Sequence, residues 1–233
     1  MRDLIRYATL APTGHDTQPW RFRLAKDHIE LVPDFSRRTP AVDPDDHHRF
    51  VSLGCAAETL ALAAGACGYA GEISFNSADG GSVAFAFKNG RTVESALFEA
   101  IPKRQSTRAD YDAREVGPEE LRILAEATAI PGIDLILLTE RPPIDRVRDM
   151  VVAGNSAQMA DADLLRELRT WLRFSPRRAI EMGDGLFSAA SGSPMAPAWL
   201  GPHVFDWFFH AGVENDKYAR QIRSSAGVAV FVS

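Results

Sequence analysis

The stretch Ala11-Pro12-Thr13-Gly14-His15-Asp16-Thr17-Gln18-Pro19-Trp20 decides how this chain is organised. Its two prolines and its glycine exclude a helix and favour a compact loop. Five of its side chains are polar and stand beside a large aromatic residue. Such a loop suits a flat ligand with polar edges, because the backbone can approach closely at Gly14 and side chains can reach the ring edge. The alternative is an ordinary helix-to-strand connection built on an Asx or Thr turn.

The composition is that of a folded, water-soluble chain. With 233 residues, of which 45% are hydrophobic and 24% charged, the chain can bury one large core or two small ones. A net charge of −5 argues against a general nucleic-acid binder. The N-terminus has no apolar signal-peptide region, and no apolar run is long enough for a membrane span.

The two cysteines, Cys55 and Cys67, fall within one predicted helix. The helical rise separates them by roughly 18 Å, which is far beyond disulfide reach. Reduced thiols and a cytoplasmic location are therefore expected.

The elements next to the loop are predicted from patterning. A short amphipathic helix over 3–10 precedes the loop, and a hairpin over 21–24 and 29–32 follows it. A longer helix is expected from Asp43, as N-cap, with Pro44 at its first position, to about Ala66. Its many small residues predict close packing on several sides. The acidic and histidine residues at 43–48 allow a metal site, but adjacent helical histidines diverge by about 100°, which favours a capped helix start and no metal.

The remainder alternates between strands and helices. Strands are predicted over 72–76, 82–88, 133–138 and 228–232, the third of them buried, and helices over 93–101, 118–127, 144–159 and 161–174. The proline-rich stretch at 188–202 and the aromatic residues after it predict a lid over a cleft at about 188–209. A simple surface excursion is the alternative.

A second polar cluster, Arg104-Gln105-Ser106-Thr107-Arg108, follows Lys103. In an extended segment Arg104, Ser106 and Arg108 project to one side. Two guanidinium groups flanking a hydroxyl make a good phosphate cradle, because arginine offers bidentate, charge-assisted donors. A solvated loop between two helices is the alternative.

Together these two motifs resemble the nitroreductase superfamily of flavin enzymes. The stretch 12–20 is similar to its Pro-Ser-Ser-x-Asn-x-Gln-Pro-Trp signature, and 104–108 to its Arg-x-Ser-x-Arg element, which holds the FMN phosphate and ribityl chain. The order of the motifs is inverted here, as in the Acg-type subfamily, which is similar to a fused pseudo-dimer. The resemblance implies an α+β, nitroreductase-like fold of two half-units, 1–100 and 101–233. It also implies that FMN is held by the following residues: Pro12, Thr13, Gly14, Asp16, Gln18, Arg104, Ser106 and Arg108.

The chain departs from that family pattern in three places. Thr13-Gly14 replaces the serine pair, and Asp16 stands where the family has asparagine, so an acceptor-only carboxylate replaces an amide. The chain also ends at Ser233, inside an expected core strand, so the fold is expected to be incomplete at the C-terminus. The resemblance implies a monomeric pseudo-dimer, and the alternative is a homodimer formed through the open apolar edge at the C-terminus.

The resemblance implies an FMN-dependent oxidoreductase that passes hydride from NAD(P)H to a small nitro or quinone-type acceptor, with no catalytic side chain assigned. A second hypothesis is a non-enzymatic protein that binds or sequesters flavin beneath the lid. A third is a flavin-free binding module that uses a basic helix. Basic amphipathic helices can bind membranes or nucleic acid. The cations of this predicted helix are Arg166, Arg169, Arg173, Arg177 and Arg178. The negative net charge argues against this third hypothesis.

Overall fold

The computed structural model describes residues 1–128, 130–197 and 199–232. The chain divides into two compact units, each made of two segments. The first unit comprises Met1–Thr107 and Glu167–Phe187, and the second comprises Arg108–Arg166 and Ser188–Ser233. These two units differ from the predicted half-units 1–100 and 101–233. The half-units describe an internal duplication of the chain, and they stay a prediction.

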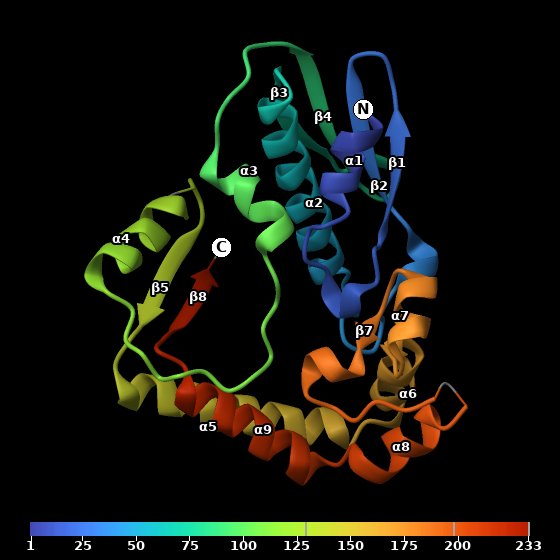
Figure 1. The fold of residues 1–233 in the computed structure, drawn as a ribbon, viewed down its shortest axis with the longest axis vertical. Helices are drawn as coiled ribbons and strands as arrows, with labels where there is room; N and C mark the ends of the chain where they lie inside the picture. Colours follow the sequence, from blue (N-terminus) through green and yellow to red (C-terminus); the bar gives the residue numbers. More distant parts are fainter. Residues whose placement is uncertain (129, 198, 233) are drawn as a thin grey trace. The chain divides into compact units, whose positions relative to one another are not determined.

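The first unit is built on a four-stranded antiparallel sheet (Figure 1). Its strands are β1 (Trp20–Leu24), β2 (His28–Pro33), β3 (Tyr69–Asn76) and β4 (Ser82–Asn89), in the order β1-β2-β4-β3. Alternate residues of β2 are buried, and Ile29 faces Phe85 of β4 across the sheet. The predicted hairpin over 21–24 and 29–32 and the predicted strands over 72–76 and 82–88 are thus confirmed, which agrees with an α+β fold.

The long helix α2 (His47–Ala66) packs against this sheet and against α1 (Arg2–Ala8). Ala56, Ala57, Ala63 and Ala64 of α2 are fully buried, because their small side chains let neighbouring elements approach closely. The predicted packing of this helix on several sides is confirmed. Cys55 lies within α2, Cys67 lies directly after it, and both thiols are free.

The predicted start of α2 is wrong by three residues. The N-cap is Asp46, in the left-handed conformation, and neither Asp43 nor Pro44 belongs to the helix. Asp43 nevertheless accepts hydrogen bonds from the backbone N–H groups of His48 and Arg49, both at 3.0 Å. Its carboxylate therefore satisfies the first helical donors from a tight turn outside the helix.

The rest of the first unit comes from two distant parts of the chain. The predicted helix over 93–101 is shorter, as α3 (Ala96–Ala100), because Ser95 caps it by accepting from the N–H of Phe98. The predicted helix over 161–174 ends earlier, as α6 (Ala162–Trp171), which belongs to this unit from Glu167 onward. It is followed by β6 (Leu172–Arg173), α7 (Pro176–Met182) and β7 (Leu186–Phe187), and β6 and β7 pair in parallel.

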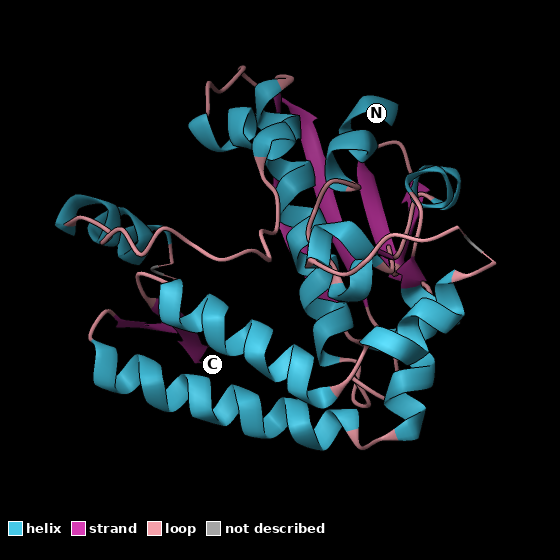
Figure 2. Cartoon of the chain, turned by 60° about the horizontal axis from the view of Figure 1, so that its bottom comes forward, coloured by secondary structure: helices cyan, strands magenta, loops and turns pink. Residues whose placement is uncertain are grey.

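The second unit contains a helical pair and a two-stranded sheet. Its elements are α4 (Pro118–Ala127), β5 (Asp134–Leu138), α5 (Arg141–Met159), α8 (Gly201–Phe208), α9 (Ala211–Ser224) and β8 (Val228–Val232). Helices α5 and α9 lie side by side (Figure 2). They run antiparallel, because Arg141 donates to the carbonyl of Arg223 while Asn155 donates to Asn215 at 2.7 Å.

One expectation for the second unit is wrong. Strand β5 was expected to be buried, yet Ile136 is exposed, because β8 is the one described strand that pairs with it. The proline-rich stretch at 188–202 begins with a short 3-10 turn over Ser188–Ser191, and α8 starts at Gly201, near its end. Ala198 of that stretch and Ser233 lie outside the described residues, and the lid role of 188–209 stays a prediction.

Candidate functional site

The loop 11–20 of the first unit adopts an unusual backbone conformation. His15, Asp16 and Gln18 have φ values of 50°, 49° and 51°, in the left-handed region that side-chain-bearing residues avoid. Such conformations persist where surrounding contacts over-determine them, and they cluster at ligand sites. Three of the six described non-glycine residues with a positive φ thus lie in this one loop.

Two predicted ligand residues in this loop are hydrogen-bonded to each other. Gln18 Nε2 donates to Asp16 Oδ1 at 2.9 Å and to the Thr9 carbonyl at 3.5 Å. The Gln18 N–H donates to Thr13 Oγ1 at 3.4 Å. The carboxylate of Asp16, where the family pattern has an amide, thus finds its donor within the loop.

The loop has open space at Gly14 and a small cavity between it and α2. A Cβ atom built on Gly14 would meet no atom within 4 Å, so the backbone there is open to approach. A cavity of about 10 Å³, which Gly14 also lines, lies between the loop and residues of α2, including Arg49 and Ser52. A cavity of this size holds at most about one water molecule. A larger ligand therefore does not fit into this cavity.

Arg104 lies beside the start of this loop. Its Nη2 donates to the Leu10 carbonyl at 2.9 Å, and its Nη1 donates to Ser106 Oγ at 3.3 Å. Both partners are uncharged. Burial raises the pKa of the Cys55 thiol, and the positive charge of Arg104 acts in the opposite direction, which places this guanidinium near α2 as well. The structure thus brings Arg104 and Ser106 to the N-terminal side of the loop.

Arg108 belongs to the second of the two compact units. It begins that unit, where its carbonyl accepts a hydrogen bond from Gln221 Nε2 at 2.8 Å. Its assignment to the same phosphate cradle as Arg104 stays a prediction.

Sequence reasoning missed an ion-pair cluster that touches the loop. Asp184 Oδ2 lies 2.9 Å from Arg37 Nη1, and Asp184 Oδ1 lies 2.7 Å from Arg173 Nη2. Arg37 Nη1 also donates to the Thr17 carbonyl at 2.7 Å. The one local signal was an acidic residue between two glycines, at 183–185, directly before a short strand. Its partners are far away in the sequence and could not be paired from it.

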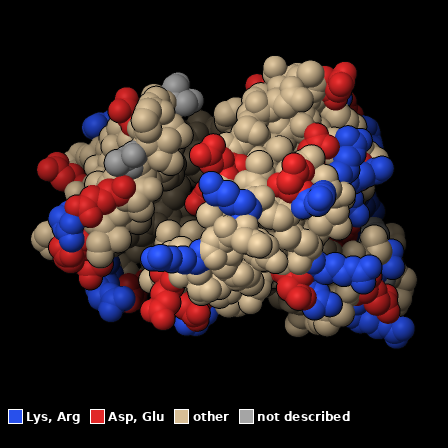
Figure 3. Space-filling model, turned by 90° about the horizontal axis from the view of Figure 1, so that it is seen from above, with Lys and Arg blue, Asp and Glu red and all other residues tan. Residues whose placement is uncertain are grey.

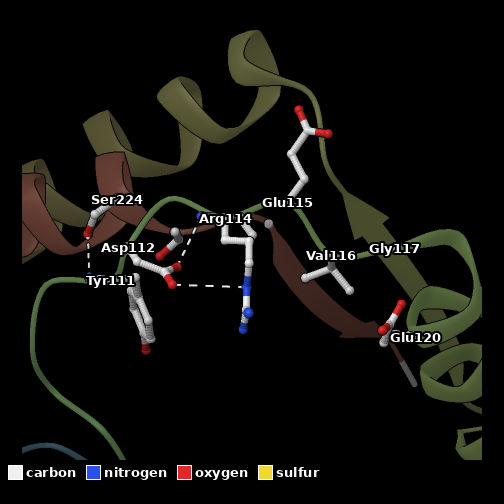
Figure 4. A pocket seen from close by; sticks show the side chains of 11 residues that line it. Tyr111, Asp112, Arg114, Glu115, Val116, Gly117, Glu120 and Ser224 are labelled. Atoms are coloured by element: carbon white, nitrogen blue, oxygen red, sulfur yellow. Dashed lines mark hydrogen bonds and ion pairs between the residues drawn. The ribbon is translucent and has the colours of Figure 1, made fainter.

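The second unit contains a separate pocket of about 760 Å³ (Figure 4). Among the described residues, its lining includes none of the eight predicted ligand residues. The Tyr111 N–H donates to Ser224 Oγ at 2.9 Å at one end, and Arg114 accompanies the acidic residues Asp112, Glu115 and Glu120. A pocket with this excess of carboxylates is poorly suited to a phosphate-bearing ligand.

The predicted basic helix is not a single helix. Chain 161–182 forms α6, β6 and α7, and Arg173 is buried against Asp184. Arg177 pairs with Glu181 at 2.7 Å, and acidic and basic side chains lie next to one another over much of the face in Figure 3. None of the described helices is long and apolar enough to cross a membrane, and no three metal-ligating side chains converge among residues 1–128, 130–197 and 199–232.

No family model matches the chain. The chain is similar to two proteins of Mycobacterium tuberculosis, "Putative NAD(P)H nitroreductase MT3217" of strain CDC 1551 / Oshkosh and "Putative NAD(P)H nitroreductase Rv3131" of strain ATCC 25618 / H37Rv. Each is 26% identical over 178 residues, which cover 73% of this chain and 50% of the relative. The chain thus spans about half the length of these curated relatives. At this identity the chain is a distant relative of these two proteins.

Proposed function

We propose that this chain holds FMN and acts in a nitroreductase-type reaction, in which NAD(P)H reduces a small nitro or quinone-type acceptor. The observation that carries the proposal is the strained polar loop 11–20 with the Arg104 guanidinium hydrogen-bonded beside its first residues. The likeness to two proteins named NAD(P)H nitroreductases supports the same class of reaction.

The residues present fit the phosphate end of FMN. Arg104 has uncharged partners, so its charge is available to an anion, and Ser106 is close enough to share the same phosphate. Arg108 is a further candidate phosphate ligand on the strength of the family resemblance alone. The acidic Asp16 repels a phosphate, so the phosphate belongs at Arg104 and away from this carboxylate.

The loop fits the ring end of the flavin. The open space at Gly14 admits a close backbone approach, and Pro12 and Thr13 form the adjoining wall of the proposed site. Asp16 and Gln18, fixed by their mutual hydrogen bond, present polar atoms to a ring edge, and the carboxylate can accept from a ring N–H. Bound FMN supplies the hydride chemistry, while these residues bind and orient it.

The finer architecture is also part of the proposal. We assign the chain to the Acg-type group, with half-units 1–100 and 101–233 forming a pseudo-dimer. The exposed apolar strand β8 provides a route to a homodimer.

The first experiment compares FMN with riboflavin, which lacks the phosphate. The purified protein is titrated with each flavin by fluorescence quenching, before and after Arg104→Ala. We expect the wild type to prefer FMN and Arg104→Ala to weaken FMN binding by roughly ten-fold, with little change for riboflavin. Arg6→Ala, which removes an exposed cation of α1 paired with Asp3, is the matched control. A wild type that binds neither flavin refutes the proposal.

A second measurement separates catalysis from storage. Flavin-loaded protein is mixed with NADH or NADPH and a nitroaromatic or quinone acceptor, and nucleotide oxidation is followed. Turnover that depends on both the flavin and the acceptor is the expected result. Tight flavin binding without turnover would instead favour a flavin-sequestering protein.

A further inference from the structure

The segment Glu167–Phe187 is distant in sequence from the rest of the first unit but belongs to it. Two carboxylates of this segment contact the N-terminal part of the unit. At one end, Glu167 accepts from the backbone N–H groups of Ala41 and Val42, at 2.9 and 3.2 Å. At the other end, Asp184 pairs with Arg37 at 2.9 Å. A carboxylate makes both contacts, but Glu167 accepts from neutral backbone groups, whereas Asp184 pairs with a charged guanidinium group.

Asp184 is the more deeply buried of the two carboxylates. Its side chain is 7% exposed, and it is shared between Arg37 and Arg173, of which Arg173 is itself buried. A carboxylate so far removed from water is tolerated because two guanidinium groups balance its charge and satisfy its oxygens. Loss of its charge would leave a buried Arg173 without its counter-ion.

This cluster reaches the backbone of the loop through two hydrogen bonds. Arg37 Nη1 donates to the Thr17 carbonyl at 2.7 Å, and the Gly185 N–H donates to the Asp16 carbonyl at 2.8 Å. These carbonyls lie between the left-handed residues Asp16 and Gln18. The two bonds therefore fix the orientation of consecutive peptide groups in the strained part of the loop.

Gly185 makes this approach possible. It has a φ of +80°, and a Cβ atom built on it would lie 2.4 Å from the Trp171 carbonyl oxygen. A residue with a side chain cannot occupy this position without displacing the backbone that presents the N–H group.

We propose that Asp184 is a positioning residue for the candidate flavin loop, which it holds in its strained conformation through Arg37 and through the adjoining Gly185. The effect on flavin binding rests on the function proposed above, whereas the effect on the loop does not. Because Asp184 acts on the loop through Arg37, the distant 167–187 segment is part of the support of the proposed site.

The loop is tested without flavin, by amide hydrogen exchange of peptides covering residues 11–20. Asp184→Asn keeps the shape of the side chain and removes its charge. We expect exchange in these peptides to accelerate roughly ten-fold, and FMN binding to weaken by a similar factor. If Asp184→Asn fails to fold, Arg37→Gln serves in its place, because it removes the Thr17 contact and leaves the Arg173–Asp184 pair. Arg37→Lys, which keeps the charge, should recover part of the protection.

Glu167→Gln is the matched control, because it weakens the other fastening of the same segment. It should accelerate exchange around 41–42 and leave the loop unchanged. Folded Asp184→Asn and Arg37→Gln proteins with wild-type loop exchange would overturn the inference. So would equal acceleration of the loop by Glu167→Gln. Wild-type protein that binds no FMN would remove the proposed function, and hydrogen exchange would still decide the role of Asp184.

Discussion

The two units differ most in how much apolar surface they bury. The hydrophobic core cluster of the described residues lies within the first unit and draws on α1, α2 and the four-stranded sheet. Among the described residues of the second unit, the buried hydrophobic ones are Ile144, Ala196, Val204 and Phe205. A strained loop needs a rigid support, since its unfavourable φ values must be over-determined by packing. The first unit provides that support, which is why we place the candidate site there.

Two phenylalanines show the difference at the scale of one side chain. Phe85 in β4 is 1% exposed and Phe231 in β8 is 62% exposed, although both stand in short apolar strands. Strand β4 has a neighbour on each side and is covered by α2, whereas β8 pairs with β5 alone among the described strands. Burial therefore follows from the number of layers around a strand and not from its own sequence.

The largest expected effect comes from removing Phe85. Phe85→Ala should lower the free energy of unfolding by about 3–5 kcal/mol, because it loses transfer energy and leaves a cavity in the core. Phe231→Ala should change it by less than about 1 kcal/mol, since its ring is largely exposed. Urea unfolding of the two variants, followed by circular dichroism, measures both. Equal losses would contradict the contrast between the units.

Much of the fold was predictable because its signals are local. The hairpin of β1 and β2, the helix Pro118–Ala127 and the strand Val228–Val232 follow from alternation, caps and turn residues within a short stretch. The start of α2 was missed because Asp43 caps it from outside the helix.

The candidate site was predictable in part. The loop and Arg104 carry recognisable residue types, and the structure places Arg104 against Leu10, at the start of the loop. The support by Asp184 was not predictable, because its partners Arg37 and Arg173 meet it through tertiary contacts alone. Pairings of this kind depend on the packing of distant segments and leave no local pattern.

The second prediction concerns a glycine inside the first unit. A Cβ atom on Gly71 of β3 would lie 2.2 Å from the Ala86 carbonyl oxygen and 2.7 Å from the Phe85 ring. Gly71→Ala should therefore destabilise the protein by about 2 kcal/mol, because a paired backbone carbonyl cannot move aside without distorting the sheet. Chemical unfolding measures the loss, and hydrogen exchange should show it across β3 and β4. A neutral result would mean that the sheet yields more easily than its burial indicates.

A third prediction uses acid to separate the units. In the first unit, the hydrogen bond from Arg21 is the main cause that lowers the pKa of Asp34 from 3.8 to about 2, assisted by Ser36 and opposed by burial. A lowered carboxyl pKa stabilises the fold above the unfolded value, and this contribution is lost as the pH falls from about 4 to about 2. Arg21 is 70% exposed, so screening limits the contribution to about 1–2 kcal/mol.

Unfolding free energies measured between about pH 7 and pH 2.5 test this prediction. Asp34→Asn should flatten the acid limb of the stability profile, while the wild type loses stability there. The control comes from the second unit, where a hydrogen bond from Arg122 lowers the pKa of Glu119 on an exposed helix face. Glu119→Gln should leave the profile unchanged, because solvent screens that pair. A profile altered by Glu119→Gln and not by Asp34→Asn would reverse the assignment.

The smallest expected effect is a stabilisation of the second unit. Gly154 lies inside α5, and a Cβ atom built on it would meet no atom within 4 Å. Gly154→Ala should therefore raise the stability of α5 by about 0.5–1 kcal/mol, because alanine restricts the unfolded chain and favours the helix. Hydrogen exchange of peptides from α5 and α9 measures the gain, and peptides from the first-unit sheet report any spread. If exchange slows in α5 and α9 alone, the second unit opens independently of the first. Equal slowing in the sheet would instead show that the two units unfold as one cooperative body, and the contrast between them would then concern packing and not stability.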